Sequence, residues 1–392
     1  MSSTAEIKTA ALAMKEKTAF FLSGADHYRS EKIFDVEFEK VYSRDWIYAA
    51  HVSQLPNKGD YLKFGFAGEE IVVVRGEGNQ FFANLNVCAH RGYRLCSEAR
   101  GNVRAFVCGY HQWSFNLDGS LKRVPQMLDG EYFDYCKHGL KTAQVEVWNG
   151  MIFIHLGSGA AEPLHPRLAP TMAAVQRFAP ERTRLAHEKN YAIAGNWKIV
   201  VENAMECYHC AGNHPSLCSV IDVPGLIADL KLWLDDQGGG NDNALAAGGM
   251  RVKKGMKTMS PDGDLICGKL LGNLTAEDAA IGITAGVMVI PNFFVGMFYV
   301  DHWWTIAIRP KSATETELLY QWFVRDDAVE GEDYDVQRLI EVADNTQTED
   351  NVLIERTQRG VNSRYYVPGP IGSDVEPALY DVLLNYKKFM EA

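Results

Sequence analysis

Two short stretches of the chain, CAHRGYRLC (88–96) and VCGYHQW (107–113), carry side chains that can bind a metal. Thiolate and imidazole groups suit zinc, copper and iron–sulfur centres. A zinc finger usually takes two cysteines from one stretch and two histidines from the other. Here each stretch supplies one of each. The candidate ligands are Cys88, His90, Cys108 and His111.

This pattern favours a [2Fe–2S] cluster of the Rieske type, in which one iron takes two thiolates and the other takes two imidazoles. Two alternatives stay open, a structural zinc site and loops that bind no metal. Cys96 is not needed for the cluster, and we expect it to be a small buried side chain. A disulfide from Cys96 or Cys136 across the cluster is disfavoured, because neither residue lies between the predicted ligands.

A second group of candidate ligands lies in NWKIVVENAMECYHCAGNHPSL (196–217). His209 and His214 are five positions apart, so on an ideal helix their side chains diverge by about 140°. Gly212 and Pro215 predict that the helix breaks near 211–213, which lets the two imidazoles share one metal. Two histidines with one carboxylate form the facial triad of non-haem iron(II) oxygenases.

The carboxylate of such a triad is expected in DNTQTEDNVLIERTQRG (344–360), which has a helical pattern. Asp350 is the preferred ligand and Glu349 the alternative. Glu206 precedes His209 by three residues, so it either orients that histidine or is an exposed charge. Asn203 either lines the same pocket or lies on the helix surface.

Composition excludes several classes of protein. The chain of 392 residues has a net charge of −11, and its one basic stretch is RVKKGMK (251–257), which argues against a nucleic-acid partner. No stretch is apolar enough to span a membrane. The N-terminal 28 residues have a helical pattern with internal charges rather than the pattern of a signal peptide. Eight cysteines are too sparse for a disulfide scaffold, which favours the cytoplasm.

The chain is expected to be α+β, with a helical lead-in over 1–44, an antiparallel β domain over 45–156 and a catalytic domain over 157–392. The lead-in is expected to pack with the catalytic domain. Residues 156–170 are rich in Gly, Ala and Pro and are interpreted as a linker. The helices expected beyond it are 171–178, 197–211 and 334–359. The expected strands are 286–299, 303–310 and 316–324.

Together, CAHRGYRLC…CGYHQWSFNLDG, NWKIVVENAMECYHCAGNHPS and EDNVLIERTQRGVNSRYYVPGP resemble the catalytic α subunit of Rieske non-haem iron oxygenases over essentially the whole chain. The resemblance implies a Rieske domain followed by a helix-grip catalytic domain. It implies that the first four ligands hold the cluster, with Trp113 packed beside it. It also implies that His209, His214 and Asp350 hold the catalytic iron.

Glu206 departs from the family pattern, in which most members have aspartate at this position. In the family this residue bridges a cluster histidine of one subunit to an iron-binding histidine of the next, within a homotrimer. Glutamate followed by CYHC resembles the branch that acts on quaternary ammonium and N-methyl compounds, such as glycine betaine, choline, carnitine and proline betaine.

The resemblance implies a monooxygenase that takes NAD(P)H electrons from a separate flavin and iron–sulfur reductase, or through a ferredoxin. The chain shows no glycine-rich nucleotide fingerprint after a strand, since GGGNDNALAAGGM (238–250) has no apolar strand before it. The expected reaction hydroxylates a C–H bond or removes an N-methyl group. Aromatic-ring or aryl-acid hydroxylation is the alternative, and pure electron transfer is the alternative of another class.

A quaternary ammonium group has no N–H to donate, so aromatic faces are expected to recognise it. PNFFVGMFYVDHWWTIAI (291–308) supplies many rings, although rings that alternate along a strand are more often core. The candidate members of an aromatic cage are Phe293, Tyr299, Trp303 and Trp304.

Overall fold

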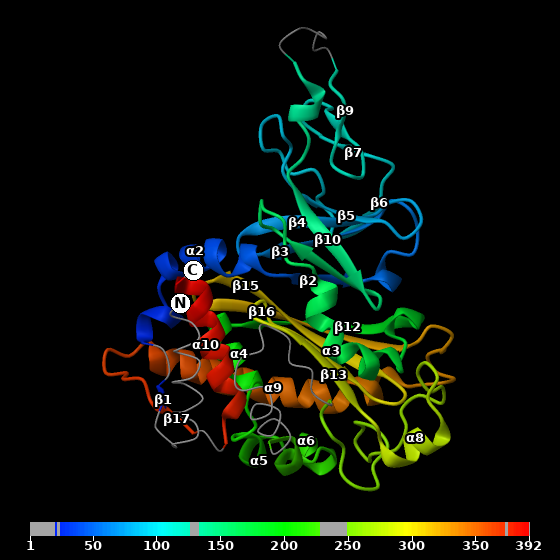
Figure 1. Ribbon diagram of the computed structural model, residues 1–392, viewed down its shortest axis with the longest axis vertical. Helices are drawn as coiled ribbons and strands as arrows, with labels where there is room; N and C mark the ends of the chain where they lie inside the picture. The colour runs from blue at the N-terminus through cyan, green and yellow to red at the C-terminus, as the bar shows by residue number, and fades with distance from the viewer. Residues whose placement is uncertain (1–19, 22–23, 126–132, 228–248, 373–374, 392) are drawn as a thin grey trace. The chain divides into compact units, whose positions relative to one another are not determined.

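The computed structural model describes residues 20–21, 24–125, 133–227, 249–372 and 375–391. By its contacts the chain divides into two compact units, 43–162 and a second one that joins 1–42 to 163–392 (Figure 1). Within the described residues, no helix combines the length and the apolar character that crossing a membrane requires. The glycine-rich stretch 238–250 lies almost entirely outside the described residues.

The smaller unit is built from antiparallel sheets, as the sequence predicts. Seven strands form one sheet in the order β2-β11-β10-β5-β4-β3-β6, and three short strands form another in the order β7-β8-β9. The Ile and Val residues of strand β4 are buried on both faces of the larger sheet, so this strand belongs to the core of the unit. The strands are β2 Ile47–His51, β3 Asp60–Phe66, β4 Glu69–Arg75, β5 Phe81–Leu85, β6 Arg100–Asn102, β7 Phe106–Val107, β8 Ser114–Phe115, β9 Leu121–Arg123, β10 Thr142–Trp148 and β11 Met151–His155.

The larger unit holds a five-stranded antiparallel sheet in the order β12-β16-β15-β14-β13. Its strands are β12 Thr183–Ile193, β13 Ala285–Val289, β14 Phe294–Phe298, β15 Trp303–Ser312 and β16 Glu315–Arg325. The long helix α9, Val336–Val361, lies against this sheet and is orange in Figure 1. Gln347 of α9 accepts a hydrogen bond from the Tyr320 hydroxyl of β16 at 2.7 Å. This is the helix-grip arrangement, and the fold class is therefore α+β as predicted.

Shorter elements surround the sheet of the larger unit. They are β1 Phe20–Phe21, η1 Ala25–Tyr28, α2 Glu31–Lys40, α3 Leu164–Gln176, η5 Pro180–Arg182, α4 Trp197–Ala204, α5 Cys210–Asn213, α6 Pro215–Val220, α8 Ala276–Ile281, β17 Pro370–Ile371 and α10 Pro377–Glu391.

Several predicted boundaries were wrong. The helix expected at 171–178 begins earlier, at Leu164, inside the predicted linker, with Pro163 at its N-cap and Pro170 within it. The helix expected over 197–211 ends at Ala204. Residues 20–21, expected within an N-terminal helix, pair instead with β17, and residues 1–19 lie outside the described part.

A buried carboxylate ties α2 to α4 and α10. Glu37 is fully buried and accepts hydrogen bonds from Lys198 at 2.5 Å, Tyr386 at 2.7 Å and Trp197 at 2.9 Å. The ammonium of Lys198 also lies 4.9 Å from the centre of the Trp197 ring. Burial outweighs the charge of Glu37 and lowers the pKa of Lys198, while the hydrogen bonds of Glu37 join α2 to α4 and α10.

Glu202, on the same helix α4, makes stability depend on pH. Burial raises the pKa of Glu202 to about 7, although the Tyr28 hydroxyl donates to it at 2.7 Å. The neutral carboxyl contributes its full stability below the ordinary pKa of 4.5, and this is lost as the pH rises to about 7. We expect Glu202→Gln to increase the free energy of unfolding at pH 8 by on the order of 2 kcal/mol, with no gain at pH 4.5. Thermal unfolding at both pH values checks this, and an equal shift at the two would contradict it.

Candidate functional site

The loop that carries the first pair of predicted cluster ligands is closed by two backbone hydrogen bonds. The carbonyl of Cys88 accepts from the N–H of Gly92, and the N–H of Cys88 donates to the carbonyl of Tyr93, both at 2.9 Å. The turn requires a left-handed residue, and Gly92 supplies it with φ of 73°.

The second loop repeats this geometry. Cys108 accepts from the N–H of Gln112 at 3.0 Å and donates to the carbonyl of Trp113 at 2.8 Å. Gln112 takes the left-handed conformation, with φ of 61°, although it is not glycine. The two loops therefore hold Cys88 and Cys108 in equivalent backbone turns, which suits a cluster to which each loop gives one cysteine and one histidine.

The four predicted cluster ligands come together at the ends of these loops. Cys88 and Cys108 are both buried, and burial together with the neighbouring Cys108 thiol raises the pKa of Cys88. The rings of His90 and His111 are 4.6 Å apart, and Trp113 stacks on His90 at 4.7 Å. The Nδ1 atom of His111 is buried and has no hydrogen-bond partner among the described residues. Two buried thiols and two adjacent imidazoles, one with an unpartnered nitrogen, fit a cluster of the Rieske type.

Asn86 anchors the first loop from inside the protein. Its side-chain oxygen accepts from the N–H groups of Leu95 and Cys96 at 3.0 and 2.8 Å. Its side-chain nitrogen donates to the carbonyl of Cys96 and to Glu70, both at 2.9 Å. Cys96 is itself buried and unbridged, as the sequence predicts.

We expect Asn86→Ala to destabilise the cluster loop, because it leaves several buried backbone groups without partners. Each such group costs about 1–3 kcal/mol. The measurement is the rate at which the cluster absorbance bleaches during mild heating, compared with Asn116→Ala. Asn116 makes its side-chain hydrogen bond to Ser120 at the surface, so its loss is a matched control. Equal bleaching of the two variants would contradict the anchoring role.

The second group of predicted ligands lies where the helical segment after α4 is broken twice. The chain leaves the α-helix at Ala204, and α5 begins only at Cys210. His209 immediately precedes α5, and His214 lies between α5 and α6, which opens with Pro215. The break predicted near 211–213 lies directly after Asn213, whereas the earlier break between Ala204 and Cys210 was not predicted. The result brings the two rings to 5.0 Å from one another.

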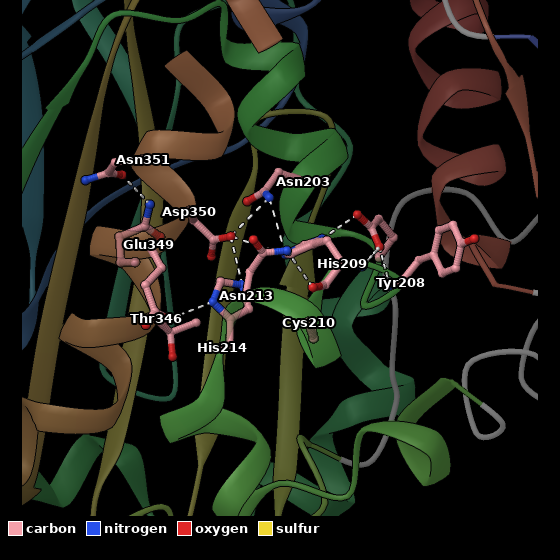
Figure 2. Close-up of polar contacts among 12 residues, drawn as sticks. Asn203, Tyr208, His209, Cys210, Asn213, His214, Thr346, Glu349, Asp350 and Asn351 are labelled. Atoms are coloured by element: carbon pink, nitrogen blue, oxygen red, sulfur yellow. Dashed lines mark hydrogen bonds and ion pairs between the residues drawn. The ribbon is translucent and has the colours of Figure 1, made fainter. Parts of the chain in front are cut away.

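Both histidines face one oxygen atom of Asp350. The distance to Oδ1 of Asp350 is 3.2 Å from Nε2 of His209 and 3.0 Å from Nε2 of His214 (Figure 2). Nε2 of His214 is buried and has no hydrogen bond of acceptable angle, despite this short distance. Two imidazole nitrogens and a carboxylate oxygen that converge without a complete hydrogen-bond pairing fit a divalent cation of the facial-triad type.

Each histidine has a glutamate at its other ring nitrogen. Glu206 lies 2.5 Å from Nδ1 of His209, and Glu349 lies 2.8 Å from Nδ1 of His214. Glu206 also accepts from the N–H groups of Tyr208 and His209. Glu349 was the alternative ligand in the sequence, yet it approaches the opposite nitrogen of His214 from the one that faces Asp350. Such carboxylates fix the tautomer and the orientation of a ligating histidine.

The carboxylates also control the charge of the site. Burial lowers the pKa of His209, but hydrogen bonds to Asp350 and Glu206 outweigh it and raise the pKa to about 10. The pKa of His214 is raised for the same reason, by Asp350 and Glu349 against burial. The protein thus favours positive charge between these carboxylates, which a metal cation provides in place of protons.

Asn203 belongs to this pocket rather than to the helix surface. Its side-chain nitrogen donates to Oδ1 of Asp350 at 3.1 Å and lies 3.4 Å from Nε2 of His209. It comes from the last turn of α4 and shares the space in front of the two histidines with them (Figure 2). It is placed to hold Asp350 in one orientation.

A cavity of about 120 Å³ opens in front of these residues. One face of the sheet forms its wall, through alternate residues of β13 to β16. This volume suits a small molecule, since pockets for drug-sized ligands hold about 300–1,000 Å³. Besides the residues already named, the wall includes Met250, Met288, Phe293, Val295, Met297, Trp304, Ile306, Leu318, Tyr320 and Gln347.

Two of the four predicted aromatic residues, Phe293 and Trp304, line this cavity, and the other two do not. Trp303 points to the opposite face of the sheet, where it stacks on Phe323 at 4.0 Å. Tyr299 is buried beyond the end of β14, with its ring stacked on His302. Side chains alternate along a strand, so adjacent tryptophans cannot both face one cavity.

Tyr320 lines the cavity and was missed in the sequence. It stacks on Trp304, with ring centres 5.9 Å apart and planes 18° apart. Its place in the cavity follows from the pairing of β15 with β16, in which Tyr320 lies opposite the cavity residue Ile306. The register between two strands is not visible in the spacing of residues along either strand.

We expect Glu349→Gln to weaken the metal site without removing it. Loss of a carboxylate that orients a ligating histidine typically lowers metal affinity 10- to 100-fold. The measurement is the dissociation constant for added iron(II) under anaerobic conditions, with Glu341→Gln as the control on an exposed position of α9. An affinity unchanged within about twofold would contradict a role for Glu349 at His214.

Comparison with known proteins places both units. A family model described as "Ring hydroxylating alpha subunit (catalytic domain)" matches residues 180–392, and one described as "Rieske [2Fe-2S] domain" matches 45–142. The glycine betaine monooxygenase oxygenase subunit of Pseudomonas aeruginosa (strain UCBPP-PA14) is 32% identical, over 96% of this chain and 92% of its own length. The carnitine monooxygenase oxygenase subunit of Escherichia coli (strain K12) is 34% identical, over 51% of this chain and 54% of its own.

The fold has solved relatives. A structure of the quaternary ammonium Rieske monooxygenase CntA with an inhibitor covers 96% of this chain and 97% of its own, at 22% identity and a TM-score of 0.75. At 22% identity, this similarity shows only that the two proteins share a fold. The family models and the full-length relatives show more: the chain belongs to the ring-hydroxylating α-subunit family, as the terminal oxygenase component of a Rieske monooxygenase that uses a [2Fe–2S] cluster and a mononuclear iron.

Proposed function

We propose that this oxygenase acts on a small quaternary ammonium compound and hydroxylates one of its N-methyl groups. The observation that carries the proposal is the composition of the cavity wall. Phe293, Trp304 and Tyr320 supply aromatic faces, and no Lys or Arg is found among the described lining residues. Aromatic faces attract a permanent cation, which cannot donate a hydrogen bond. The nearly full-length relatives named as glycine betaine monooxygenases support the same class of substrate.

The proposed ligands follow the geometry of the two loops and the broken helix. Cys88, His90, Cys108 and His111 would hold the cluster, and His209, His214 and Asp350 would hold the iron. When bound, the iron would supply the activation of O2 and the cluster would supply the electrons. Around it, Asn203 fixes Asp350, and the aromatic wall holds the substrate cation with a methyl group toward the histidines.

The proposed reaction balances without a further reactant. An N-methyl group, O2, two electrons and two protons give the N-hydroxymethyl compound and water. That carbinolamine then breaks its C–N bond to release formaldehyde, the tertiary amine and a proton. The apolar residues of the cavity wall would keep bulk water away from the reacting methyl group.

Electrons are proposed to cross between subunits of a homotrimer, from His111 of one subunit through Glu206 to His209 of the next. Two features support this route. His90 and Tyr110 lie exposed beside the cluster loops, and Tyr208 lies exposed beside Glu206. Such exposed aromatic side chains are enriched where protein surfaces meet.

The electrons are proposed to come from NAD(P)H through a flavin and iron–sulfur reductase, or through a ferredoxin, in the cytoplasm. The name "oxygenase subunit" of the relatives supports a system of several components. The chain itself is proposed to contribute the cluster and the iron alone.

The test is substrate-dependent oxidation of NADH by the purified holoenzyme with a surrogate reductase. Candidate substrates are glycine betaine, choline, carnitine and proline betaine, with aryl acids as the comparison set. Formaldehyde released with a quaternary ammonium compound supports the proposal. Ring hydroxylation of an aryl acid, with no NADH oxidation in the presence of any of the four quaternary ammonium compounds, would overturn it.

A further inference from the structure

Two cysteines enclose the proposed iron ligand His209 in one backbone turn. The N–H of Cys210 donates to the carbonyl of Cys207 at 3.2 Å. A turn closed by such a bond keeps the first and last Cα atoms within about 7 Å. Disulfides join residues whose Cα atoms are about 4.4–6.8 Å apart, so the backbone is already arranged for a bridge.

The side chains of the two residues also face one space. Cys207 and Cys210 both line the cavity in front of the histidines. Both are free thiols in the structure. A third cysteine, Cys218, donates to the backbone carbonyl of Cys210 at 3.4 Å, which directs its sulfur to the main chain. The pair Cys207 and Cys210 is therefore the arrangement closest to a disulfide at this site.

We propose that Cys207 and Cys210 form a peroxide-sensitive dithiol that closes to a reversible disulfide and loosens iron binding at His209. Hydrogen peroxide, the product of two-electron reduction of O2, is the oxidant. One thiol attacks it to give a sulfenic acid and water. The second thiol then displaces water to form the disulfide. Two thiols and one peroxide thus give one disulfide and two waters, and a dithiol reductant restores the thiols.

The expected effect on iron binding follows from the hydrogen bonds that orient His209 within this turn. Glu206 accepts from the N–H groups of Tyr208 and His209 and from Nδ1 of His209, so the turn sets the direction of that imidazole. Because the backbone spacing already suits a bridge, closing a bond of about 2.05 Å between the sulfurs changes the side chains of both cysteines, which lie on either side of His209 in the turn. The ring of His209 then moves relative to Asp350, which comes from a separate helix. This consequence rests on the proposed ligands, whereas formation of the disulfide does not.

The test treats the iron-loaded holoenzyme with a small excess of hydrogen peroxide and quenches it with catalase. Free thiols are alkylated in denaturant, disulfides are reduced, and the released thiols are labelled with a second reagent for peptide mass spectrometry. We expect Cys207 and Cys210 to carry the second label together, and dithiothreitol to reverse this before labelling. Cys136→Ser, which removes an exposed thiol, is the matched control and should give the same result.

Two outcomes would overturn the proposal in different ways. If the first reagent alkylates both Cys207 and Cys210, the two thiols were still free after peroxide treatment, and this disulfide is excluded. Pairing of either residue with Cys218 would also exclude it. The second readout is the rate at which a chelator removes the mononuclear iron, expected to rise at least fivefold on oxidation in the wild type and not in Cys207→Ser. A disulfide without this rise would overturn the coupling to iron. Neither readout depends on the substrate, so failure of the proposed reaction is seen separately.

Discussion

Replacing Asp350 with alanine is expected to remove the mononuclear iron and abolish product formation while leaving the cluster intact. Oδ1 of Asp350 faces Nε2 of both His209 and His214. Without this carboxylate, two neutral imidazoles remain for a hard divalent ion that prefers oxygen and nitrogen ligands together. Total iron should fall from about three atoms per chain to about two, because the cluster keeps its own pair.

The measurements for Asp350→Ala are metal analysis and the visible absorbance of the cluster. Glu341→Gln, on an exposed position of the same helix α9, is the control and should keep all its iron and its activity. Retention of the full iron content in Asp350→Ala would contradict this ligand set. Glu349→Ala would then be the next variant to analyse, because Glu349 is the other carboxylate at these histidines.

Replacing Glu206 with glutamine is expected to block electron transfer to the iron rather than to remove the iron. The change deletes the negative charge at Nδ1 of His209 and puts an amide in its place. Loss of an orienting carboxylate costs roughly 10- to 100-fold in activity or affinity. We therefore expect product formation to fall by roughly 100-fold, with the iron content still above half of wild type.

The readout that separates this role from a merely structural one is a single turnover. The cluster is reduced anaerobically and then mixed with O2 and substrate. In Glu206→Gln the reduced cluster should reoxidise far more slowly than in the wild type. Glu206→Asp, which keeps the charge on a shorter arm, should restore much of the rate. Fast reoxidation in Glu206→Gln would contradict the proposed route through this carboxylate.

The sequence was sufficient to predict which Cys and His residues the structure brings together, because the members of each candidate ligand group lie close together along the chain. Cys88 and His90, or His209 and His214, are separated by a single turn, so spacing alone constrains them. The choice between Asp350 and Glu349 needed more. Neighbours on a helix point about 100° apart, and both reach a histidine in the structure, one at Nε2 and the other at Nδ1.

The residues of the cavity wall were harder to predict from the sequence than the candidate metal ligands. Trp303 and Trp304 lie in a strand whose residues are buried on both faces. An unbroken apolar run does not indicate which face meets the core and which meets a cavity. Strand β12 was missed entirely, because its many charged residues hide the alternation that a half-buried strand shows. The position of β12 in the sheet depends on its pairing with β16, and the sequence of one strand alone does not indicate which distant strand it pairs with.

Stoichiometry decides whether this oxygenase removes an N-methyl group from a quaternary ammonium compound. The holoenzyme and a reductase are supplied with NADH, O2 and the best of the four candidate amines, and all consumed and released species are counted. We expect one formaldehyde for each O2 and each NADH consumed, and Trp304→Ala should raise the KM for the quaternary ammonium compound. Tight coupling of O2 and NADH consumption to a stable hydroxylated product, with no formaldehyde, would contradict it.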